Sequence, residues 1–301
     1  LEAIDLDGQL LCLNKVITAV TNTMRPSFDQ VIKPDDPYPT PVLGETACGW
    51  PEYDCTEQET SSYRSQDGSC NNLENPNWGK ANIPFLRWLP ANYGDGESTM
   101  RTDDYNNALP NERTISFTLN EDEDFFHPYN TLACMVFGQF LDHDITLTPL
   151  QTEGEYGDIE DVNCGEDNCQ MDHPACLPIQ KPHDDPFDSG QPCLGFIRSR
   201  PVPSMPCDED NIREQMNAQT AFIDASQVYG RSLEEAIFLR DMSGNGMLME
   251  TEHPFDPHMK PLLKESDSGC EVHNATHKCF RAGDPRVNEH VALASYHTIF
   301  S

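Results

Sequence analysis

Basic residues are scarce in this sequence. Its 301 residues include 19 Lys and Arg against 51 Asp and Glu, which gives a formal net charge of −32 at pH 7. Nucleic acids and anionic membrane surfaces carry charge of the same sign, so the composition disfavours both and leaves small molecules and cations as partners. We interpret four acidic runs as solvated loops, with a specific acidic binding site as the alternative; they are Asp103–Asp104, Glu121–Asp124, Asp158–Asp161 and Asp208–Asp210.

Long apolar runs are absent as well. No stretch approaches the roughly 20 apolar residues that a membrane span needs, and no signal-peptide pattern opens the chain. The first residue is Leu1, and the apolar helical pattern of Val291–Phe300 closes the sequence without a stop signal. We therefore expect the chain to be a fragment of a longer polypeptide or one part of a processed protein.

Cysteine is abundant, with 12 residues, but no two of them form the Cys-x-x-Cys pair that is typical of zinc clusters. Zinc is therefore the weaker alternative to disulfide bonds, which form in an oxidising compartment. The sequon Asn274-Ala275-Thr276 adds support, so we expect a secreted glycoprotein. Cys134 lies within an apolar helical pattern and is expected to be free.

The 24 Pro and 18 Gly residues indicate many irregular connections between short helices. Residues 1–24 show an amphipathic helical pattern, and 25–51 is interpreted as a wrapping or pro-like segment or a linker. Segment 52–120 is expected to be mostly loop. Further helices are predicted at about Tyr129–Thr146, Asp210–Gln219 and Leu233–Met242, with a cysteine-rich excursion at 150–210. No strand pattern is convincing, so the predicted fold class is mainly α and loop-rich.

The Tyr129–Thr146 helix carries an unusual polar group. Gln139, Asp142 and His143 stand at i, i+3 and i+4, so they project from one face of a helix that is otherwise apolar. Burying them without partners would cost on the order of a few kcal/mol each. The pattern favours a polar ligand against this face, although a structural histidine satisfied by neighbours remains the alternative to a catalytic one.

Five blocks resemble signatures of the animal haem peroxidase family, in the family's order. The most specific is Gln139–Asp144 followed by Leu147-Thr148-Pro149. The other blocks lie at 63–79, 182–199, 215–230 and 279–289. The resemblance covers roughly residues 50 to 301 and implies the animal haem-peroxidase fold, with 1–51 preceding it and 52–301 forming the distal half of the domain.

The resemblance assigns roles to individual residues. His143 matches the distal histidine, an acid and base for hydrogen peroxide, and Arg286 matches the arginine that stabilises charge during O–O cleavage. Gln139 would order peroxide or halide by hydrogen bonding. Asp142 and Glu289 match carboxylates that form ester links to haem b. A surface salt bridge is the alternative for Arg286 and Glu289.

Some members of the family carry a methionine joined to haem where this chain has His290. The difference leaves bromide, iodide, thiocyanate or phenols such as tyrosine as expected substrates. The family's proximal iron ligand would follow the Val291–Phe300 helix, and neither His290 nor His297 matches its context. We therefore expect the remaining C-terminal half of the domain to be a partner of this chain.

A calcium site is also implied by the resemblance. Alternate residues of one loop could offer oxygen ligands, and Asp144 would join them from the helix beside His143. The loop residues are Thr220, Phe222 (through its carbonyl), Asp224 and Ser226. Alternatively, these groups make only local turn hydrogen bonds. The resemblance also places disulfides at Cys270 with Cys279 and among Cys164 to Cys193.

Two functions compete at this point. The first is an extracellular peroxidase that reduces hydrogen peroxide and oxidises a small substrate. The second is a calcium-stabilised adhesion or matrix protein that keeps the fold without turnover. No Arg-Gly-Asp or Lys-Gly-Asp tripeptide occurs, which weakens the adhesion alternative.

Overall fold

The structure is a computed structural model that describes residues 54–301 except 57–58, 60, 88, 121–125, 127, 152–163, 165–168, 170–174, 186–189, 203–211, 244–245, 257, 267–268 and 271–277. The predicted helix at 1–24, the segment 25–51 and the sequon at 274–276 lie outside the described residues. No helix among the described residues is long and apolar enough to cross a membrane.

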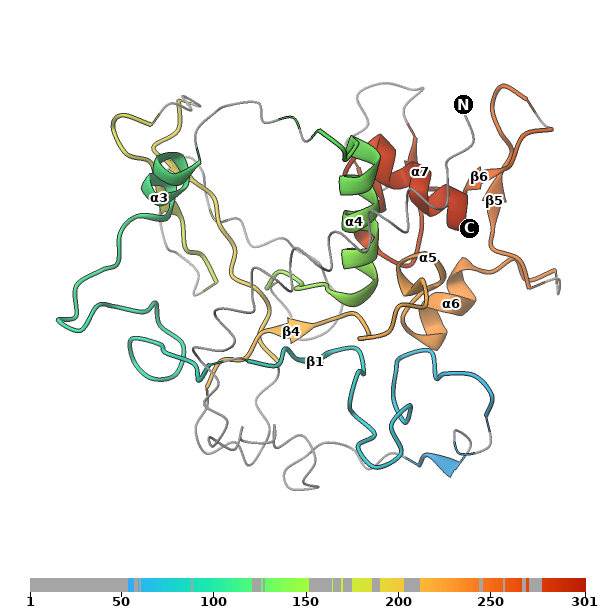
Figure 1. Ribbon diagram of the computed structural model, residues 1–301, viewed down its shortest axis with the longest axis horizontal. Coiled ribbons are helices and arrows are strands. Elements are labelled where there is room, and N and C mark those ends of the chain that lie inside the picture. The colour runs from blue at the N-terminus through green and yellow to red at the C-terminus, as the bar shows by residue number, and fades with distance from the viewer. Residues whose placement is uncertain are drawn as a thin grey trace.

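Two helices pack together at the centre of the functional region. Helix α4 (Leu132–Ile145) and helix α7 (Val291–Phe300) lie side by side, and the short helices α5 (Ser226–Tyr229) and α6 (Leu233–Leu239) sit at their end (Figure 1). The predictions of helices at 129–146, 233–242 and 291–300 are thereby confirmed. Helix α6 begins where Ser232 accepts a hydrogen bond from the Glu235 N–H, a typical N-cap.

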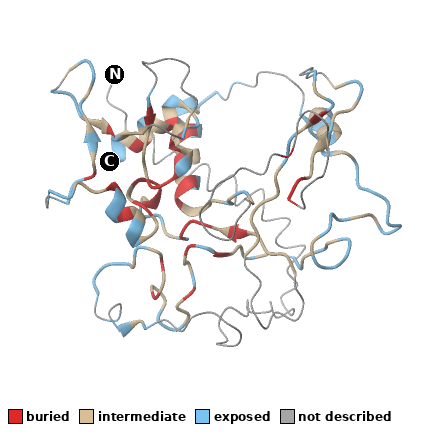
Figure 2. Cartoon of the chain, turned by 180° about the vertical axis from the view of Figure 1, so that it is seen from behind, coloured by how far each residue is buried: buried red, intermediate tan, exposed pale blue. Residues whose placement is uncertain are grey.

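The main core lies between these helices. Its buried side chains are Phe140, Val228, Leu239, Leu248 and Leu293. The Phe140 ring stacks on Phe300 with centroids 5.1 Å apart. Figure 2 shows the buried residues concentrated around α4, α5 and α7. Burying each large apolar side chain contributes about 1.5–3 kcal/mol, so this core fixes α4 relative to α7.

The described strands are two-residue pairs in four antiparallel ladders. They are β1 (Ile83–Pro84) with β4 (Met216–Asn217), β2 (Ile179–Gln180) with β3 (Cys193–Leu194), β5 (Glu250–Thr251) with β6 (Leu262–Leu263), and β7 (Glu265–Ser266) with β8 (Cys279–Phe280). A strand of two residues is too short to give an alternating pattern, which is why the sequence showed none. The mainly α fold class holds.

The helix predicted at Asp210–Gln219 is wrong, because the described part of this segment contains strand β4. Asn217 explains the extended backbone. Its Oδ1 accepts from the Leu147 N–H at 3.0 Å, and its Nδ2 donates to the Ile145 carbonyl at 2.9 Å. The segment therefore binds the end of α4 through a side chain rather than forming its own helical hydrogen bonds.

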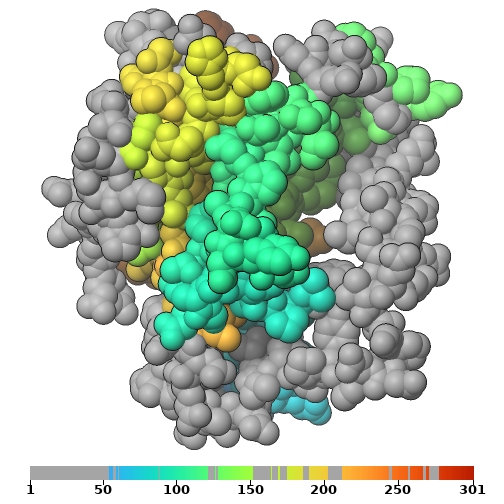
Figure 3. Space-filling view, turned by 90° about the vertical axis from the view of Figure 1, so that its left-hand side faces the viewer, coloured from blue at the N-terminus to red at the C-terminus, as the bar shows by residue number. Residues whose placement is uncertain are grey.

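Helix α3 (Glu112–Leu119) lies in a stretch that was expected to be mostly loop. Asn111 caps it by accepting from the Thr114 N–H, and its amide also donates to the Gln180 carbonyl at 2.9 Å. Arg113 forms a bidentate ion pair with Asp185 at 2.7 and 2.8 Å. Figure 3 shows α3 and the stretch that carries β2 and β3 side by side on one face of the molecule. Contacts distant in sequence therefore support this helix.

Four disulfide bonds are described: Cys55–Cys70, Cys164–Cys176, Cys169–Cys193 and Cys270–Cys279. They confirm the disulfide interpretation and the expected Cys270–Cys279 pair. Cys134 is also disulfide-bonded, so the prediction of a free thiol is wrong. The physical reason is that the first turn of α4 is not buried, since Leu132 is 71% exposed and Cys134 is only partly buried.

Candidate active site

The polar face of α4 meets the segment that precedes α7. The 3₁₀ helix η2 (Pro285–Asn288) carries Arg286 and leads directly to Glu289. The Gln139 amide donates to a Glu289 carboxylate oxygen at 2.7 Å, and the His143 Nε2 lies 4.0 Å from the same oxygen. Residues about 150 positions apart in the sequence are thereby brought together around His143.

His143 is 4% exposed, whereas Asp142 and Glu289 remain open to solvent. Burial, followed by the positive charge of Arg286, holds the pKa of His143 below its ordinary value. The carboxylates of Asp284, Glu289 and Asp142 oppose this shift without reversing it. At neutral pH the imidazole is therefore uncharged and able to accept a proton.

Arg286 is fixed by a buried carboxylate. Its Nε and Nη2 donate to Asp284 at 2.9 and 2.7 Å, and Nη2 also donates to the Thr146 carbonyl at 2.6 Å. Burial raises the pKa of Asp284, but the hydrogen bonds and charge of Arg286 outweigh burial and lower it overall. Since Asp284 is fully buried, the alternative of a surface salt bridge for Arg286 is wrong.

One nitrogen of Arg286 remains available. Among the described residues, its Nη1 makes no hydrogen bond, while Nε and Nη2 are engaged by Asp284 and Thr146. The guanidinium therefore combines a permanent positive charge, a fixed position and an unengaged Nη1. These are the properties needed to stabilise negative charge that develops beside His143.

Two carboxylates flank His143 on the solvent side. Asp142 accepts from the Thr146 hydroxyl at 2.9 Å, and the Glu289 side chain is 43% exposed. His290 completes this edge, because its Nε2 lies 2.8 Å from the Gln139 Oε1. Exposed carboxylates on two elements around a buried imidazole fit a prosthetic group that covers this face.

The loop before α5 is anchored to α4 by Asp144, which is 1% exposed. Its carboxylate accepts from the backbone N–H groups of Ala225 at 3.0 Å and Ser226 at 2.8 Å, and from the Ser226 hydroxyl at 3.0 Å. Ala225 has a φ of 64°, a left-handed conformation that is costly for a residue other than glycine. Asp144 thus holds a strained turn, as functional loops often require.

Of the predicted calcium ligands, Asp144, Asp224 and Ser226 lie close together at this turn. Partial burial, followed by the charge of Asp144, raises the pKa of Asp224, while Arg64 opposes the shift. Thr220 and Ser226 are buried, and the Thr220 hydroxyl accepts weakly from the Phe222 N–H at 3.4 Å. Two mutually repelling carboxylates with neighbouring hydroxyl and carbonyl oxygens fit a hard cation such as calcium. These same hydrogen bonds also fit a purely structural turn.

Sequence reasoning missed Gln219 and Asp284, which connect the two halves of the site. The fully buried Gln219 amide donates to both the His143 carbonyl at 2.9 Å and the Asp284 carboxylate at 2.8 Å. Gly283 lets the chain pass close to α5, because a Cβ there would lie 2.3 Å from the Ser226 carbonyl oxygen. The Asp284-Pro285 pair is a helix-start signal that could have revealed Asp284, whereas nothing in the sequence singled out Gln219.

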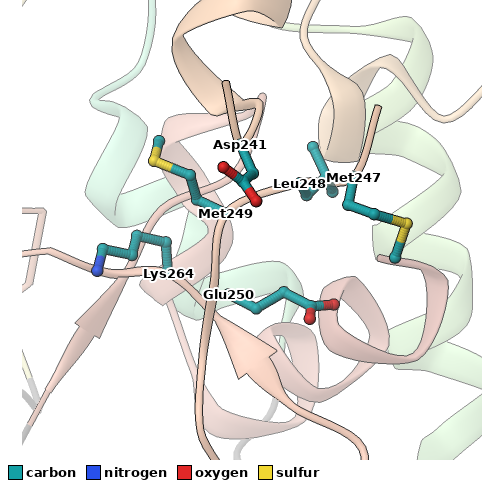
Figure 4. Close-up of a pocket in the computed structure, with 6 residues that line it drawn as sticks. All are labelled: Asp241, Met247, Leu248, Met249, Glu250 and Lys264. Carbon is teal, nitrogen blue, oxygen red and sulfur yellow. The ribbon is translucent and has the colours of Figure 1, made fainter. Parts of the chain in front are cut away.

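Elsewhere the surface has a separate hollow of about 440 Å³ near the β5–β6 ladder (Figure 4). It is lined by Asp241, Met247, Leu248, Met249, Glu250 and Lys264, and none of the predicted site residues contributes to it. Within the described part of the chain, no group of three or more His, Cys, Asp or Glu side chains could hold a metal ion. Such a group is what a zinc cluster needs, whereas calcium also uses hydroxyl and carbonyl oxygens.

Comparisons with known proteins identify the class to which this arrangement belongs. The family model for animal haem peroxidase matches residues 63–301. Lactoperoxidase of Mesocricetus auratus is 38% identical over 277 residues, which cover 87% of this chain and 38% of that protein. Myeloperoxidase of Homo sapiens is 34% identical over 278 residues, covering 86% of this chain and 36% of that protein.

A solved structure, peroxidase A from Dictyostelium discoideum, matches with a TM-score of 0.57 and 24% identity, covering 80% of this chain and 44% of that one. This structural similarity supports the assignment of a mainly α peroxidase fold. The chain belongs to the animal haem peroxidase family. It spans less than half the length of these relatives.

Proposed function

We propose that this chain supplies the distal, peroxide-cleaving side of an extracellular haem peroxidase. The observation that carries the proposal is the convergence of Gln139, His143, Arg286 and Glu289 from two distant segments. When bound, haem supplies the redox-active iron that takes oxidising equivalents from hydrogen peroxide. The other half of the domain would supply the iron ligand.

His143 acts as the acid and base. Its uncharged imidazole accepts a proton from one peroxide oxygen at Nε2 and returns it to the departing oxygen, leaving water. The permanent charge of Arg286 stabilises the negative charge that develops as the O–O bond breaks. Gln139 orients the peroxide or a halide, and its contact with His290 fixes the amide. Disulfide bonds in the described chain support an extracellular setting.

Asp142 and Glu289 are the residues that would hold haem b, through ester links to its methyl groups. Asp144, Thr220, Phe222, Asp224 and Ser226 would hold calcium and thereby support the helix that carries His143. We propose bromide, iodide, thiocyanate or phenols such as tyrosine as the small reducing substrates, with His290 beside Gln139 as the residue that separates this chain from efficient chloride oxidation.

The test is peroxide-dependent oxidation of a phenol by the haemin-loaded chain co-expressed with the remaining half of the domain, after free haemin has been removed by gel filtration. His143→Ala should lower the rate by at least about a hundredfold, which is the low end of general acid–base catalysis. His258→Ala is the matched control, because His258 is exposed and outside the site, and it should keep the full rate. A haem-loaded His143→Ala chain as fast as the control would contradict the proposal and favour a non-catalytic adhesion role.

A further inference from the structure

Three buried polar atoms, one each on α4, α5 and α7, lack a hydrogen-bond partner in the described part of the chain. The His143 Nδ1, the Gln227 Oε1 and the His297 Nε2 have no hydrogen-bond partner among the described residues. Their residues are 4%, 1% and 0% exposed, respectively. Buried polar groups are almost always hydrogen-bonded, and each one left alone costs about 1–3 kcal/mol. Three such atoms together indicate a shared partner.

The contacts of His297 and Gln227 decide which of these atoms accept hydrogen bonds. The His297 Nδ1 lies 3.0 Å from the Leu293 carbonyl, which can only accept, so Nδ1 carries the proton. Burial lowers the pKa of His297, so the ring is neutral and its Nε2 presents a lone pair. The Gln227 amide nitrogen donates to the Phe140 carbonyl at 3.1 Å, so its Oε1 is the free acceptor.

The three residues belong to α4, α5 and α7, which pack against one another, and the side chains of Gln227 and His297 both contact Phe140. The His297 ring meets the Phe140 ring edge-on at 5.0 Å, and Phe140 stands three residues before His143 on α4. The Asp284 N–H donates to the Gln227 carbonyl at 2.8 Å. The charge of Asp284 acts on both His143 and His297, and His143 itself acts on His297. Asp284 and Arg286 are the charged groups that act on both rings, while Glu289 and Asp142 act on His143.

The chemistry of His143 supplies the missing donor. The proposed function, on which this step rests, requires a lone pair at Nε2, so the single proton of the neutral ring stands at Nδ1. One donor and two acceptors are what a single water molecule satisfies, since it accepts one hydrogen bond and donates two. Buried waters typically make about three hydrogen bonds.

We propose that His297 and Gln227 are positioning residues that hold His143 in its Nδ1–H tautomer through one buried water. The water accepts from the His143 Nδ1 and donates to the His297 Nε2 and the Gln227 Oε1. This arrangement keeps the His143 Nε2 free on the peroxide side. The Glu289 carboxylate, 4.0 Å from that Nε2, is too distant to select the opposite tautomer by a direct hydrogen bond.

The test is long-range ¹H–¹⁵N NMR of the full chain labelled at histidine, which reports the tautomer of each ring without haem or turnover. The His143 signal is assigned by its loss in His143→Ala. We expect Nδ1–H at His143 in the wild type. In His297→Phe, which keeps a ring of similar size but removes the acceptor, the ratio of Nδ1–H to Nε2–H should fall about fivefold, the effect of one hydrogen bond.

His297→Gln is the matched control, because its amide oxygen can occupy the place of Nε2, and it should keep the wild-type ratio. Should His297→Phe not fold, Gln227→Leu removes the other acceptor and carries the same comparison. The inference is overturned by an Nε2–H tautomer in the wild type, or by an unchanged ratio in the folded acceptor-less variant. Absence of peroxidase activity would sink the proposed function without altering these spectra, so the two failures are distinguishable.

Discussion

Asp144 serves the loop and the helix at once, because one carboxylate satisfies two backbone N–H groups and a hydroxyl of the turn before α5. Asp144→Ala should lower the free energy of unfolding by about 2–4 kcal/mol, since it leaves buried donors unpaired. Urea denaturation measures the loss. Asp104→Ala, on an exposed loop, should change it by less than about 0.5 kcal/mol. Equal effects of the two substitutions would contradict this role of Asp144.

His297 also predicts how stability depends on pH. Burial lowers its pKa in the folded chain, whereas the unfolded chain titrates near its ordinary value of about 6.5. Below that pH the unfolded chain binds a proton that the folded chain does not, so stability falls as pH drops from about 6.5 toward the lowered folded value. His297→Gln should show a shallower decline than wild type between pH 7.5 and 5.5 in urea denaturation. An identical slope would count against a neutral buried His297.

At the scale of elements, the Cys270–Cys279 disulfide matters because β8 is bound to η2. Phe280 and Asn288 exchange two hydrogen bonds of 2.8 Å, which connect the disulfide to the segment that carries Arg286. Replacing both cysteines by serine should cost about 2–3 kcal/mol of stability, the value expected for a loop of this length.

The control for that double variant is removal of the Cys55–Cys70 disulfide. This bond joins cysteines 15 residues apart in a part of the chain that does not carry η2. Urea denaturation should show a loss of stability in both double variants, but only the variant that lacks Cys270 and Cys279 should shift the NMR signal of His143. A shift of the same size in both variants would show that the disulfide does not act through η2.

Elements with long periodic patterns could be predicted, whereas those held by single side chains could not. Helices α4 and α7 carry apolar residues over 10 or more positions, and their patterns gave both helices correctly. Helix α3 depends on the Asn111 cap and on the Arg113–Asp185 ion pair, which joins residues 72 positions apart. Strand β4 depends on contacts that Asn217 makes with the end of α4. Such contacts leave no periodic trace in the sequence.

At the scale of the whole molecule, calcium binding should make the free energy of unfolding depend on the calcium concentration. If Asp224 and Asp144 bind calcium, a concentration of 100 times the dissociation constant adds about 2.7 kcal/mol to the free energy of unfolding. EDTA should therefore lower the thermal midpoint of the wild type, and Asp224→Ala should abolish the difference. Asp104→Ala should retain it. A wild-type midpoint that is indifferent to EDTA would exclude calcium at this turn.

The site shows the same division between what was predictable and what was not. Motifs identified His143, Arg286 and Glu289, and the structure brings them together. The supports behind them, Gln219 and Asp284, were invisible because their roles depend on which backbone groups the fold buries beside them. A sequence can name the candidate groups of such a site, but the hydrogen bonds that orient them require the folded chain.

The central claim is that haem lies against the polar face of α4, between Asp142 and Glu289. The most direct measurement is the haem absorbance that stays with the chain after co-expression with the remaining half of the domain in the presence of haemin and calcium, followed by denaturation. We predict that wild type retains the absorbance and that Asp142→Ala with Glu289→Ala loses it, while Asp104→Ala behaves as wild type. Equal retention by the wild type and the double variant would contradict the account.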